Sequence, residues 1–275
     1  MKKHLTTVLL IGIFLIGFSL LLYPTFSNYW NSLHQSRAVA SYVEQVEALQ
    51  EDEYAAIWQQ ATEYNRDLAL REQRFTLSEE EDARYHATLN PIGNGIMGYV
   101  EIPSIGVNLP IYHSTEEAVL QKAIGHLDWT SLPTGGEDTH CVISGHRGLP
   151  SAKLFTDIDK LVPGDTFMLC VLDEVLTYEV ESIATVDPDD VWGLQIETGR
   201  ELCTLVTCTP YGINTHRLLI KAHRIETAQD APTIRVTADA MQVDPMIIAP
   251  ILASPVLLVL LLLLLCKPTK KRNKR

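Results

Sequence analysis

The pattern of hydrophobic and polar residues differs from one part of the chain to the next. Residues 5–23 are almost entirely apolar, over about the length that spans a bilayer as a helix. Residues 31–88 carry apolar positions at three- and four-residue steps among Glu, Gln and Arg, without Pro or Gly. This pattern predicts two helices, which are too polar to stand alone and should pack on the domain that follows. Residues 246–265 are again apolar.

Between residues 90 and 225 the sequence consists of short apolar runs separated by Pro, Gly, Asn and Asp. Such runs predict strands, which we expect at residues 98–102, 109–112, 141–144, 166–172, 177–183, 202–207 and 217–223. Seven or more short strands over about 130 residues predict a closed barrel or a sandwich, and hence a mainly β domain. An amphipathic stretch after Pro150 predicts one helix within it.

The two long apolar stretches predict a membrane anchor at each end. Residues 1–23 read as an uncleaved anchor, since the run exceeds an ordinary signal core and no small-x-small site follows; a signal peptide is the alternative. Residues 246–266 form the second predicted span, in which two prolines are tolerable. The basic tail at 267–275 and the basic N-terminus should both stay in the cytoplasm. The helical region 24–89, the β domain 90–225 and a linker at 226–245 would then lie outside the cell.

Charge is distributed unevenly along the chain. All 34 acidic residues but only 14 of the 22 basic ones lie between positions 24 and 245, a formal charge of about −20. So acidic a body should repel nucleic acid, which is itself a polyanion. An acidic, solvated surface is the simpler interpretation, and attraction of basic partners is the alternative.

Five cysteines are present, of which Cys266 lies at a predicted membrane boundary. The even number that remains could form two disulfides in an exterior domain. However, Cys141, Cys170 and Cys203 each lie inside an apolar, strand-like run, which is typical of buried free thiols that act as small hydrophobic residues.

Cys208 has a different setting, because an apolar run ends there and a turn-like segment follows it. Arg217 opens the next apolar run nine residues later. Two antiparallel strands joined by that turn would place the two residues side by side. A guanidinium next to a thiol favours the thiolate and stabilises an oxyanion. A structural cysteine and a surface arginine would fit the same spacing.

A nucleophilic cysteine needs an imidazole partner, and the chain has nine histidines. His146 follows a hydrophobic run and is flanked by glycine and by Arg-Gly, so from a flexible loop at a strand end it can point into a cleft. His216 is a lesser candidate, because it should point to the opposite face from Arg217 in a regular strand. Thiol, imidazole and guanidinium together form a set suited to acyl transfer.

At residues 204–208 the run Thr-Leu-Val-Thr-Cys resembles the signature of the sortases, cysteine transpeptidases that attach proteins to Gram-positive cell walls. The longer runs 204–219, 143–155 and 92–113 resemble the class C branch, which polymerises pilins. The resemblance implies a closed eight-stranded β-barrel with N-terminal helices, flanked by two transmembrane helices. That barrel agrees with the strands expected from the pattern.

The resemblance also implies the roles of individual residues: Cys208 as nucleophile, His146 as acid/base, and Arg217 as the positive group for substrate and oxyanion. Thr207 and Thr209, which flank Cys208, are further candidates for substrate or oxyanion contacts, and a strand-packing role is the equal alternative for Thr207. The implied substrate is a C-terminal Leu-Pro-x-Thr-Gly-like sorting signal, cleaved after its threonine through a thioacyl intermediate. The implied acceptor is a lysine amine of a pilin subunit.

No cofactor or metal is expected, since the acidic residues show neither calcium-loop spacing nor a Cys/His zinc pattern. One feature departs from class C sortases, which usually carry an Asp-Pro-aromatic lid before the barrel. Residues 74–82 lack that triplet, and although Phe75 could substitute as the aromatic plug, a polar segment without a lid role is the favoured interpretation. Two alternatives remain: a sortase that uses a cell-wall peptide amine as its acceptor, and a catalytically silent scaffold for pilus assembly.

Overall fold

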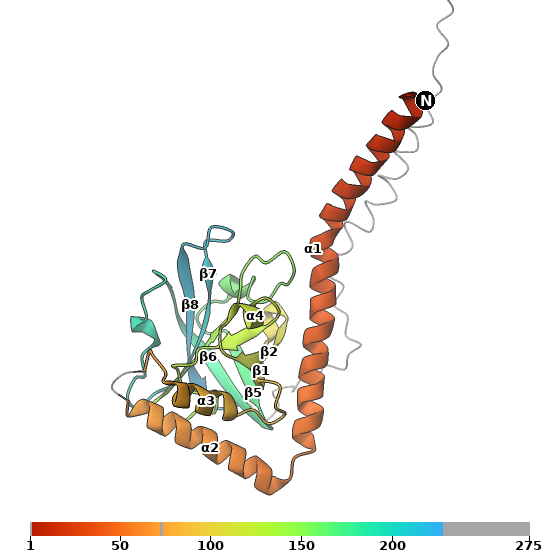
Figure 1. Cartoon of the computed structure of the whole chain (residues 1–275). Helices are drawn as coiled ribbons and strands as arrows, with labels where there is room; N and C mark the ends of the chain where they lie inside the picture. The colour runs from red at the N-terminus through yellow and green to blue at the C-terminus, as the bar shows by residue number, and fades with distance from the viewer. Residues whose placement is uncertain (1, 72–73, 228–275) are drawn as a thin grey trace, which may run out of the picture.

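The computed structural model describes residues 2–71 and 74–227 (Figure 1). The predicted second span at 246–266, the basic tail at 267–275 and nearly all of the predicted linker at 226–245 lie outside the described residues.

Eight strands form a closed barrel in the order β1-β2-β3-β4-β7-β8-β6-β5, and β5 closes the ring against β1. Their bounds are β1 Ile96–Ile102, β2 Val107–His113, β3 Ile124–His126, β4 Thr139–Ser144, β5 Thr166–Val171, β6 Glu174–Val186, β7 Glu201–Thr209 and β8 His216–Ile225. The prediction of a mainly β chain with a closed eight-stranded barrel is confirmed. Two of the pairings are parallel, β2 with β3 and β4 with β7, and the second of these positions the site.

Two details of the barrel differ from the sequence pattern. Strand β3 was not predicted, because its three residues are too few to show a period. Its central Gly125 is required, since a Cβ there would lie 2.1 Å from the carbonyl oxygen of Ser114. The helix predicted after Pro150 is wrong: turns follow that proline, and only the short 3₁₀ helix η2, Ile158–Lys160, forms.

Three helices precede the barrel where residues 31–88 predicted two. Helix α1, Lys2–Glu47, continues through Pro24 and so crosses the predicted boundary between anchor and exterior region. Helices α2, Glu51–Ala69, and α3, Glu79–Ala87, each begin at a capping box, with Ser78 and Glu81 forming the second one. A capping box satisfies free N–H groups in the first turn of a helix. The box at Ser78 and Glu81 therefore favours the start of a new helix, α3, where the sequence pattern predicted a continuous one.

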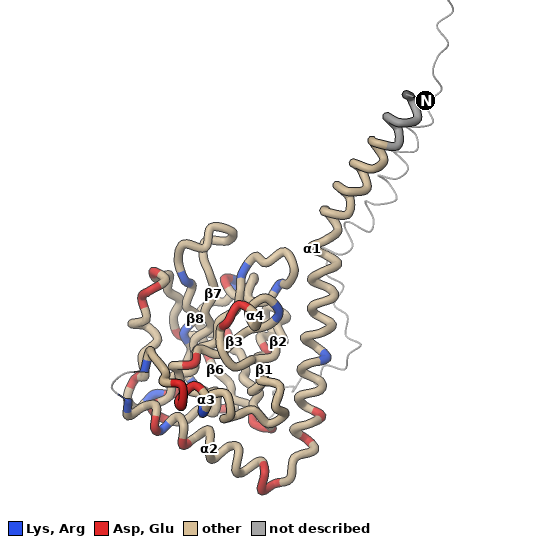
Figure 2. Tube along the Cα trace, in the orientation of Figure 1, with Lys and Arg blue, Asp and Glu red and all other residues tan. Residues whose placement is uncertain are grey.

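The helices pack on the barrel through buried tyrosines, as predicted. Tyr42 of α1 is fully buried; its hydroxyl donates to the carbonyl of Met97 at 3.1 Å and accepts from the N–H of Leu172 at 2.8 Å. Tyr64 of α2 and Tyr85 of α3 are also fully buried, with their rings 6.4 Å apart. The charged residues of α2 and α3 are exposed, apart from the half-buried Glu81, and Figure 2 marks their positions along the two helices.

The N-terminal half of α1 projects away from the barrel (Figure 1), and no Lys, Arg, Asp or Glu falls between residues 9 and 36. Its large apolar side chains are exposed, for example Ile16 at 65% and Leu20 at 70%. Among the described residues α1 is the one helix that is long and apolar enough to cross a membrane. Because exposed apolar surface of this extent is unfavourable in water, α1 indicates association with a membrane.

Candidate active site

Cys208 and Arg217 lie directly opposite each other at one end of the β7–β8 hairpin. Side chains at directly paired positions of antiparallel strands point to the same face, so the thiol and the guanidinium are neighbours. The Arg217 guanidinium donates to the carbonyl of His216 at 3.2 Å, which holds it at the start of β8. Cys208 is partly exposed, unlike the three buried cysteines Cys141, Cys170 and Cys203. The predicted hairpin and its pairing of Cys208 with Arg217 are thus present.

His146 reaches the same place through the parallel pair β4 and β7. The last paired positions are Ser144 and Val206, and the N–H of Gly145 then donates to the Val206 carbonyl at 3.1 Å. One step further, the hydroxyl of Thr207 donates to the carbonyl of Gly145 at 2.7 Å. Continuing this register by one residue brings His146 level with Cys208. The fold therefore brings the three predicted residues to one end of three neighbouring strands.

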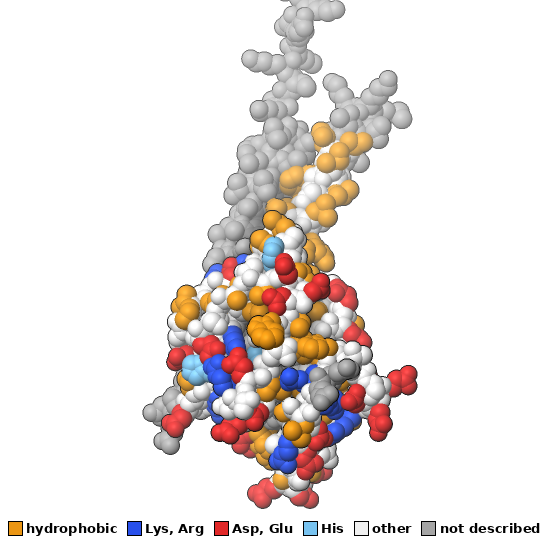
Figure 3. All heavy atoms as spheres, turned by 90° about the vertical axis from the view of Figure 1, so that its left-hand side faces the viewer, with side chains coloured by type: hydrophobic (Ala, Val, Ile, Leu, Met, Phe, Trp, Pro, Cys, Tyr) orange, Lys and Arg blue, Asp and Glu red, His pale blue; other side chains and the backbone are white. Residues whose placement is uncertain are grey.

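Alternation along β7 decides which side chains face the site. Thr207 points into the barrel, where it is 1% exposed, so Cys208 and Val206 point outward. On this outer face Val142, Leu194, Val206 and Leu219 form a small buried cluster, bordered by Leu127, Trp129 and Val186. We call these seven residues the outer apolar cluster. Figure 3, which looks onto the β7–β8 side of the barrel, shows hydrophobic side chains gathered among acidic and basic ones.

The structure places the hydroxyl of Thr207 away from this face and engages it with Gly145. Thr209 ends β7 and pairs with His216. His216 alternates with Arg217 and so points to the opposite face, as expected; its Nε2 lies 3.6 Å from a carboxylate oxygen of Asp187. Among the described residues no cluster of His, Cys, Asp and Glu is arranged to hold a metal ion.

The loop that carries His146 is held on both sides. Gly145 must lack a Cβ, because one would lie 2.7 Å from the Ile124 side chain and 2.8 Å from the Phe155 ring. The Phe155 N–H donates back to the His146 carbonyl at 3.1 Å. Beyond His146, the Arg147 guanidinium lies over the ring of Tyr211, 5.7 Å from its centroid. Since Tyr211 belongs to the turn after Cys208, the loop that carries His146 contacts the turn that follows Cys208.

Glu117 is a neighbour of His146 that the sequence did not reveal. Its Oε2 lies 3.7 Å from the His146 Nε2, which has no hydrogen-bond partner within the described part of the chain. Glu117 begins the short helix α4, Glu117–Leu120, and is 71% exposed, so water screens the attraction. No local pattern marks it, because it is distant in sequence from every other site residue.

The membrane-proximal part of α1 also contacts the site loop. Asn28 accepts from the N–H of Lys153 at 2.8 Å, and Asn31 donates to the carbonyl of Ser151 at 2.8 Å. One turn further along, Gln35 donates to the carbonyl of Lys122 at 2.8 Å, just after α4. Figure 1 shows the β7–β8 turn at the barrel end that faces the same way as the apolar half of α1. The helix thus links the segments that flank His146 and Glu117 to the membrane-associated end of the molecule.

Phe75, the aromatic residue considered as a plug, packs against Trp129 with ring centroids 4.9 Å apart and is 52% exposed. Arg74 beside it donates to the Gln195 side chain at 3.4 Å. The segment before α3 therefore lies at the border of the outer apolar cluster.

Comparisons with known proteins show which family shares this fold. Residues 100–225 match the family model described as the sortase domain. Sortase D of Bacillus subtilis is 30% identical over 136 residues, which are 50% of this chain and 66% of the relative; Sortase A of Bacillus anthracis is 26% identical over 132 residues, or 48% and 61%. The chain thus spans just under two thirds of the curated relatives it matches.

Solved structures are similar over a larger share of their length. Sortase C1 from Streptococcus agalactiae matches with a TM-score of 0.68 and 46% identity, over 70% of this chain and 100% of that one. Sortase C of Streptococcus pneumoniae matches with a TM-score of 0.62 and 39% identity, over 70% and 97%. The identity and the full coverage of these neighbours, together with the family model, show that the chain belongs to the sortase family.

Proposed function

We propose that this chain is a membrane-anchored cysteine transpeptidase that cleaves Leu-Pro-x-Thr-Gly-like sorting signals and joins the acyl-threonine to a lysine amine of a pilin subunit. The observation that carries the proposal is the convergence of Cys208, Arg217 and His146 at one end of β7, β8 and β4. A thiol, a guanidinium and an imidazole supply the nucleophile, the oxyanion partner and the proton carrier of an acyl transfer.

In the first half-reaction the Cys208 thiolate attacks the carbonyl carbon of the substrate threonine. Negative charge develops on the carbonyl oxygen, where Arg217 and backbone N–H groups stabilise it. Protonated His146 then donates its proton to the nitrogen of the leaving glycine as the peptide bond breaks. The product is a thioester between Cys208 and the threonine.

In the second half-reaction the lysine amine attacks the thioester, and neutral His146 accepts the proton that the amine loses. The carbon–sulfur bond breaks, which regenerates the Cys208 thiolate and leaves a new amide. Glu117 lies beside His146, with its Oε2 3.7 Å from the His146 Nε2.

The outer apolar cluster is the natural place for the leucine and proline of a sorting signal. It lies on the same face as Cys208 and begins two residues before it, at Val206. Two structural neighbours support this substrate class: sortase C of Clostridium perfringens was solved with its C-terminal cell wall sorting motif, and the structure of Streptococcus pneumoniae sortase C provides insights into pilin substrate specificity. Both are 39% identical to this chain.

We further propose that the domain lies outside the cell, with both termini in the cytoplasm and a second span at 246–266. The apolar half of α1 and the basic residues at both ends support this topology. A catalytic end that faces the membrane suits a substrate held there by its own hydrophobic tail. The partners are then a sorting-signal protein, a pilin lysine and the lipid bilayer, with no nucleic acid and no cofactor.

A competition assay with the full chain in membranes tests the proposed acceptor. A Leu-Pro-x-Thr-Gly peptide is supplied with equal amounts of a lysine-bearing pilin fragment and a peptidoglycan stem-peptide amine, and products are identified by mass. Predominant joining to the pilin lysine supports the proposal. Predominant joining to the stem peptide favours the cell-wall-anchoring alternative, and absence of any cleavage, with Cys208 slow to alkylate, favours the silent scaffold.

A further inference from the structure

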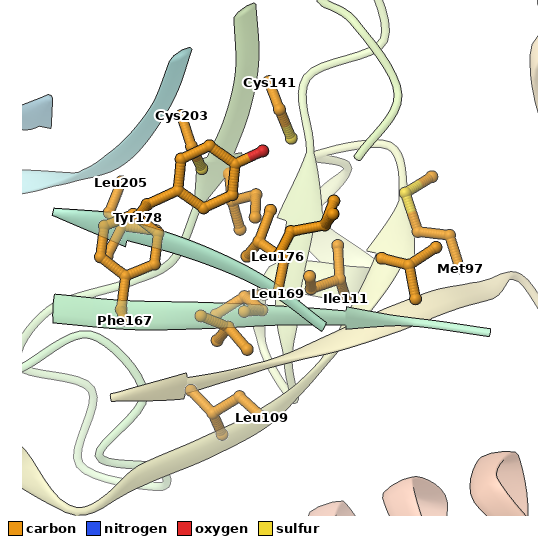
Figure 4. Packing of buried hydrophobic residues seen from close by; sticks show 14 of the residues in the cluster. Met97, Leu109, Ile111, Cys141, Phe167, Leu169, Leu176, Tyr178, Cys203 and Leu205 are labelled. Carbon is orange, nitrogen blue, oxygen red and sulfur yellow. The ribbon is translucent and has the colours of Figure 1, made fainter. Parts of the chain in front are cut away.

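Cys141 and Cys203 are direct partners on the parallel strands β4 and β7. Neighbouring strands lie about 4.7–4.9 Å apart, and a disulfide joins Cα atoms separated by roughly 4.4–6.8 Å. Both side chains project into the barrel interior beside the ring of Tyr178 (Figure 4). They are 3% and 0% exposed, and the structure shows both as free thiols.

The remaining described cysteines have no such match. Cys170 pairs with Tyr99 on one side and Val175 on the other, and Cys208 pairs with Arg217. Among the described residues, Cys141 and Cys203 therefore form the one pair of cysteines in direct register.

The surroundings of Cys141 also differ from those of an inert buried thiol. Burial alone would raise its pKa, but a hydrogen bond with the Cys203 thiol and the nearby His126 imidazole lower the pKa of Cys141. His126 is fully buried and held in place: its Nδ1 lies 3.0 Å from the Tyr85 hydroxyl and its Nε2 lies 2.8 Å from the Ser131 carbonyl. The strand register and the hydrogen bond between the two thiols place these side chains together, as a disulfide requires.

We propose that Cys141 and Cys203 form a disulfide in the exported chain. The inference rests on the proposed exterior location, where disulfides form and persist, and does not depend on catalysis. The bond would join β4 and β7 five residues before His146 and five residues before Cys208. It would therefore fix the spacing of the two strands that present the acid/base and the nucleophile.

The bond forms by thiol–disulfide exchange while the chain folds, before closure of the barrel buries both sulfurs. One cysteine thiolate attacks a disulfide-bearing oxidant, such as a small-molecule or protein disulfide, and expels one thiolate of that oxidant. The second cysteine then attacks the mixed disulfide, forms the Cys141–Cys203 bond and expels the oxidant's other thiolate. The two cysteines lose two electrons and two protons, and the oxidant leaves as two thiols.

Differential alkylation of the full chain tests this directly. Cells that carry the membrane-inserted chain are quenched in acid, denatured and alkylated with a maleimide, with or without prior reduction, and the cysteine peptides are weighed. We expect Cys141 and Cys203 to be labelled only after reduction, and Cys170, Cys208 and Cys266 in both samples. Equal labelling of Cys141 and Cys203 before and after reduction overturns the proposal and leaves them as buried hydrophobic thiols.

Stability provides a second measurement that does not depend on labelling. The oxidised chain should have a Tm that is on the order of 10 °C above that of the reduced chain, because the bond restricts a long loop of the unfolded state. A Cys141→Ala/Cys203→Ala double variant should lose this dependence on reductant, whereas the matched Cys170→Ala should keep it. A Tm that is independent of reductant in the unmodified chain contradicts the proposal. Acylation of Cys208, followed on the same sample, distinguishes this failure from failure of the proposed function.

Discussion

The hydroxyl of Thr207 donates a 2.7 Å hydrogen bond to the carbonyl of Gly145, which joins the residue before the proposed nucleophile to the residue before the proposed acid/base. Both partners lie one residue beyond Ser144 and Val206, the last pair of the β4–β7 ladder. Of the two roles considered for Thr207, a substrate or oxyanion contact and strand packing, the structure favours packing, because the side chain is buried and bound to the protein's own backbone. We infer that Thr207 acts by positioning Cys208 and His146 relative to each other.

Replacement of Thr207 by valine tests this positioning role. Thr207→Val keeps the shape but leaves the Gly145 carbonyl without its partner, which should cost about 1–3 kcal/mol of stability. The rate of Cys208 acylation should fall roughly ten- to a hundredfold, since small misplacements of catalytic groups have large effects. Thr207→Ser, which retains the hydroxyl, should recover most of the rate. Equal activity of the serine and valine variants would contradict the role of the hydroxyl.

Gly145 should not tolerate a side chain. In Gly145→Ala the new Cβ meets Ile124 and Phe155 within 2.8 Å, so the loop that carries His146 has to move. Overpacking of this kind costs about 1–3 kcal/mol, and acylation should slow with it. Gly17→Ala is the control, because its Cβ would have no atom within 4 Å and Gly17 lies far from the site, in α1. Urea unfolding and acylation rates of both variants give the comparison; wild-type behaviour of Gly145→Ala would refute the packing argument.

The contacts from α1 to the site loop should affect activity in the full chain. Asn28→Ala and Asn31→Ala each remove a hydrogen bond to residues 151–153, and each bond contributes about 0.5–1.5 kcal/mol. We expect the double variant to lower kcat/KM several-fold. Gln45→Ala is the control, since Gln45 bonds to Ser41 within α1. If the control and the double variant have the same kcat/KM, α1 is an anchor without influence on the loop.

His140 should make stability depend on pH. Burial lowers its pKa to about 4, and its ring nitrogens contact the Gln195 carbonyl at 2.7 Å and the Thr204 hydroxyl at 2.8 Å. Because the folded-state pKa lies below the unfolded value of about 6.5, the unfolded chain binds the proton more readily. The contribution of neutral His140 to the free energy of unfolding is complete above pH about 6.5 and is lost as the pH falls towards 4. The loss amounts to about 3 kcal/mol.

Urea unfolding at a series of pH values from neutral to mildly acidic measures this loss. His140→Gln cannot be protonated and should show a smaller decrease between neutral pH and pH about 4.5. A decrease of the same size in His140→Gln would assign the acid sensitivity to other groups.

Much of the fold was predictable because its signals are local. Alternating apolar runs and turn residues mark β4, β7 and β8, and the turn after Cys208 is short enough to imply the hairpin with Arg217. The Ser78–Glu81 capping box is an equally local signal for the start of α3, although the polar pattern around it concealed the break.

The remaining features depend on contacts between distant parts of the chain. The parallel pairing of β4 with β7 brings Gly145 to Thr207 and Cys141 to Cys203, and no pattern within either strand specifies that register. Glu117 meets His146 only through the arrangement of the short strand β3 beside β4. Sequence reasoning therefore named the candidate residues that the fold brings together, but not the residues that contact and position them.

The central claim is that Cys208 is the nucleophile of a thioacyl transfer assisted by His146 and Arg217. Intact-mass spectrometry of the full chain in detergent, mixed with a Leu-Pro-x-Thr-Gly peptide and then with a lysine acceptor, tests it most directly. We predict an adduct of the acyl-threonine fragment on Cys208 that is absent in Cys208→Ala, much reduced in His146→Ala and Arg217→Ala, and discharged by the acceptor. An adduct on another residue, or one that persists in Cys208→Ala, would contradict the account.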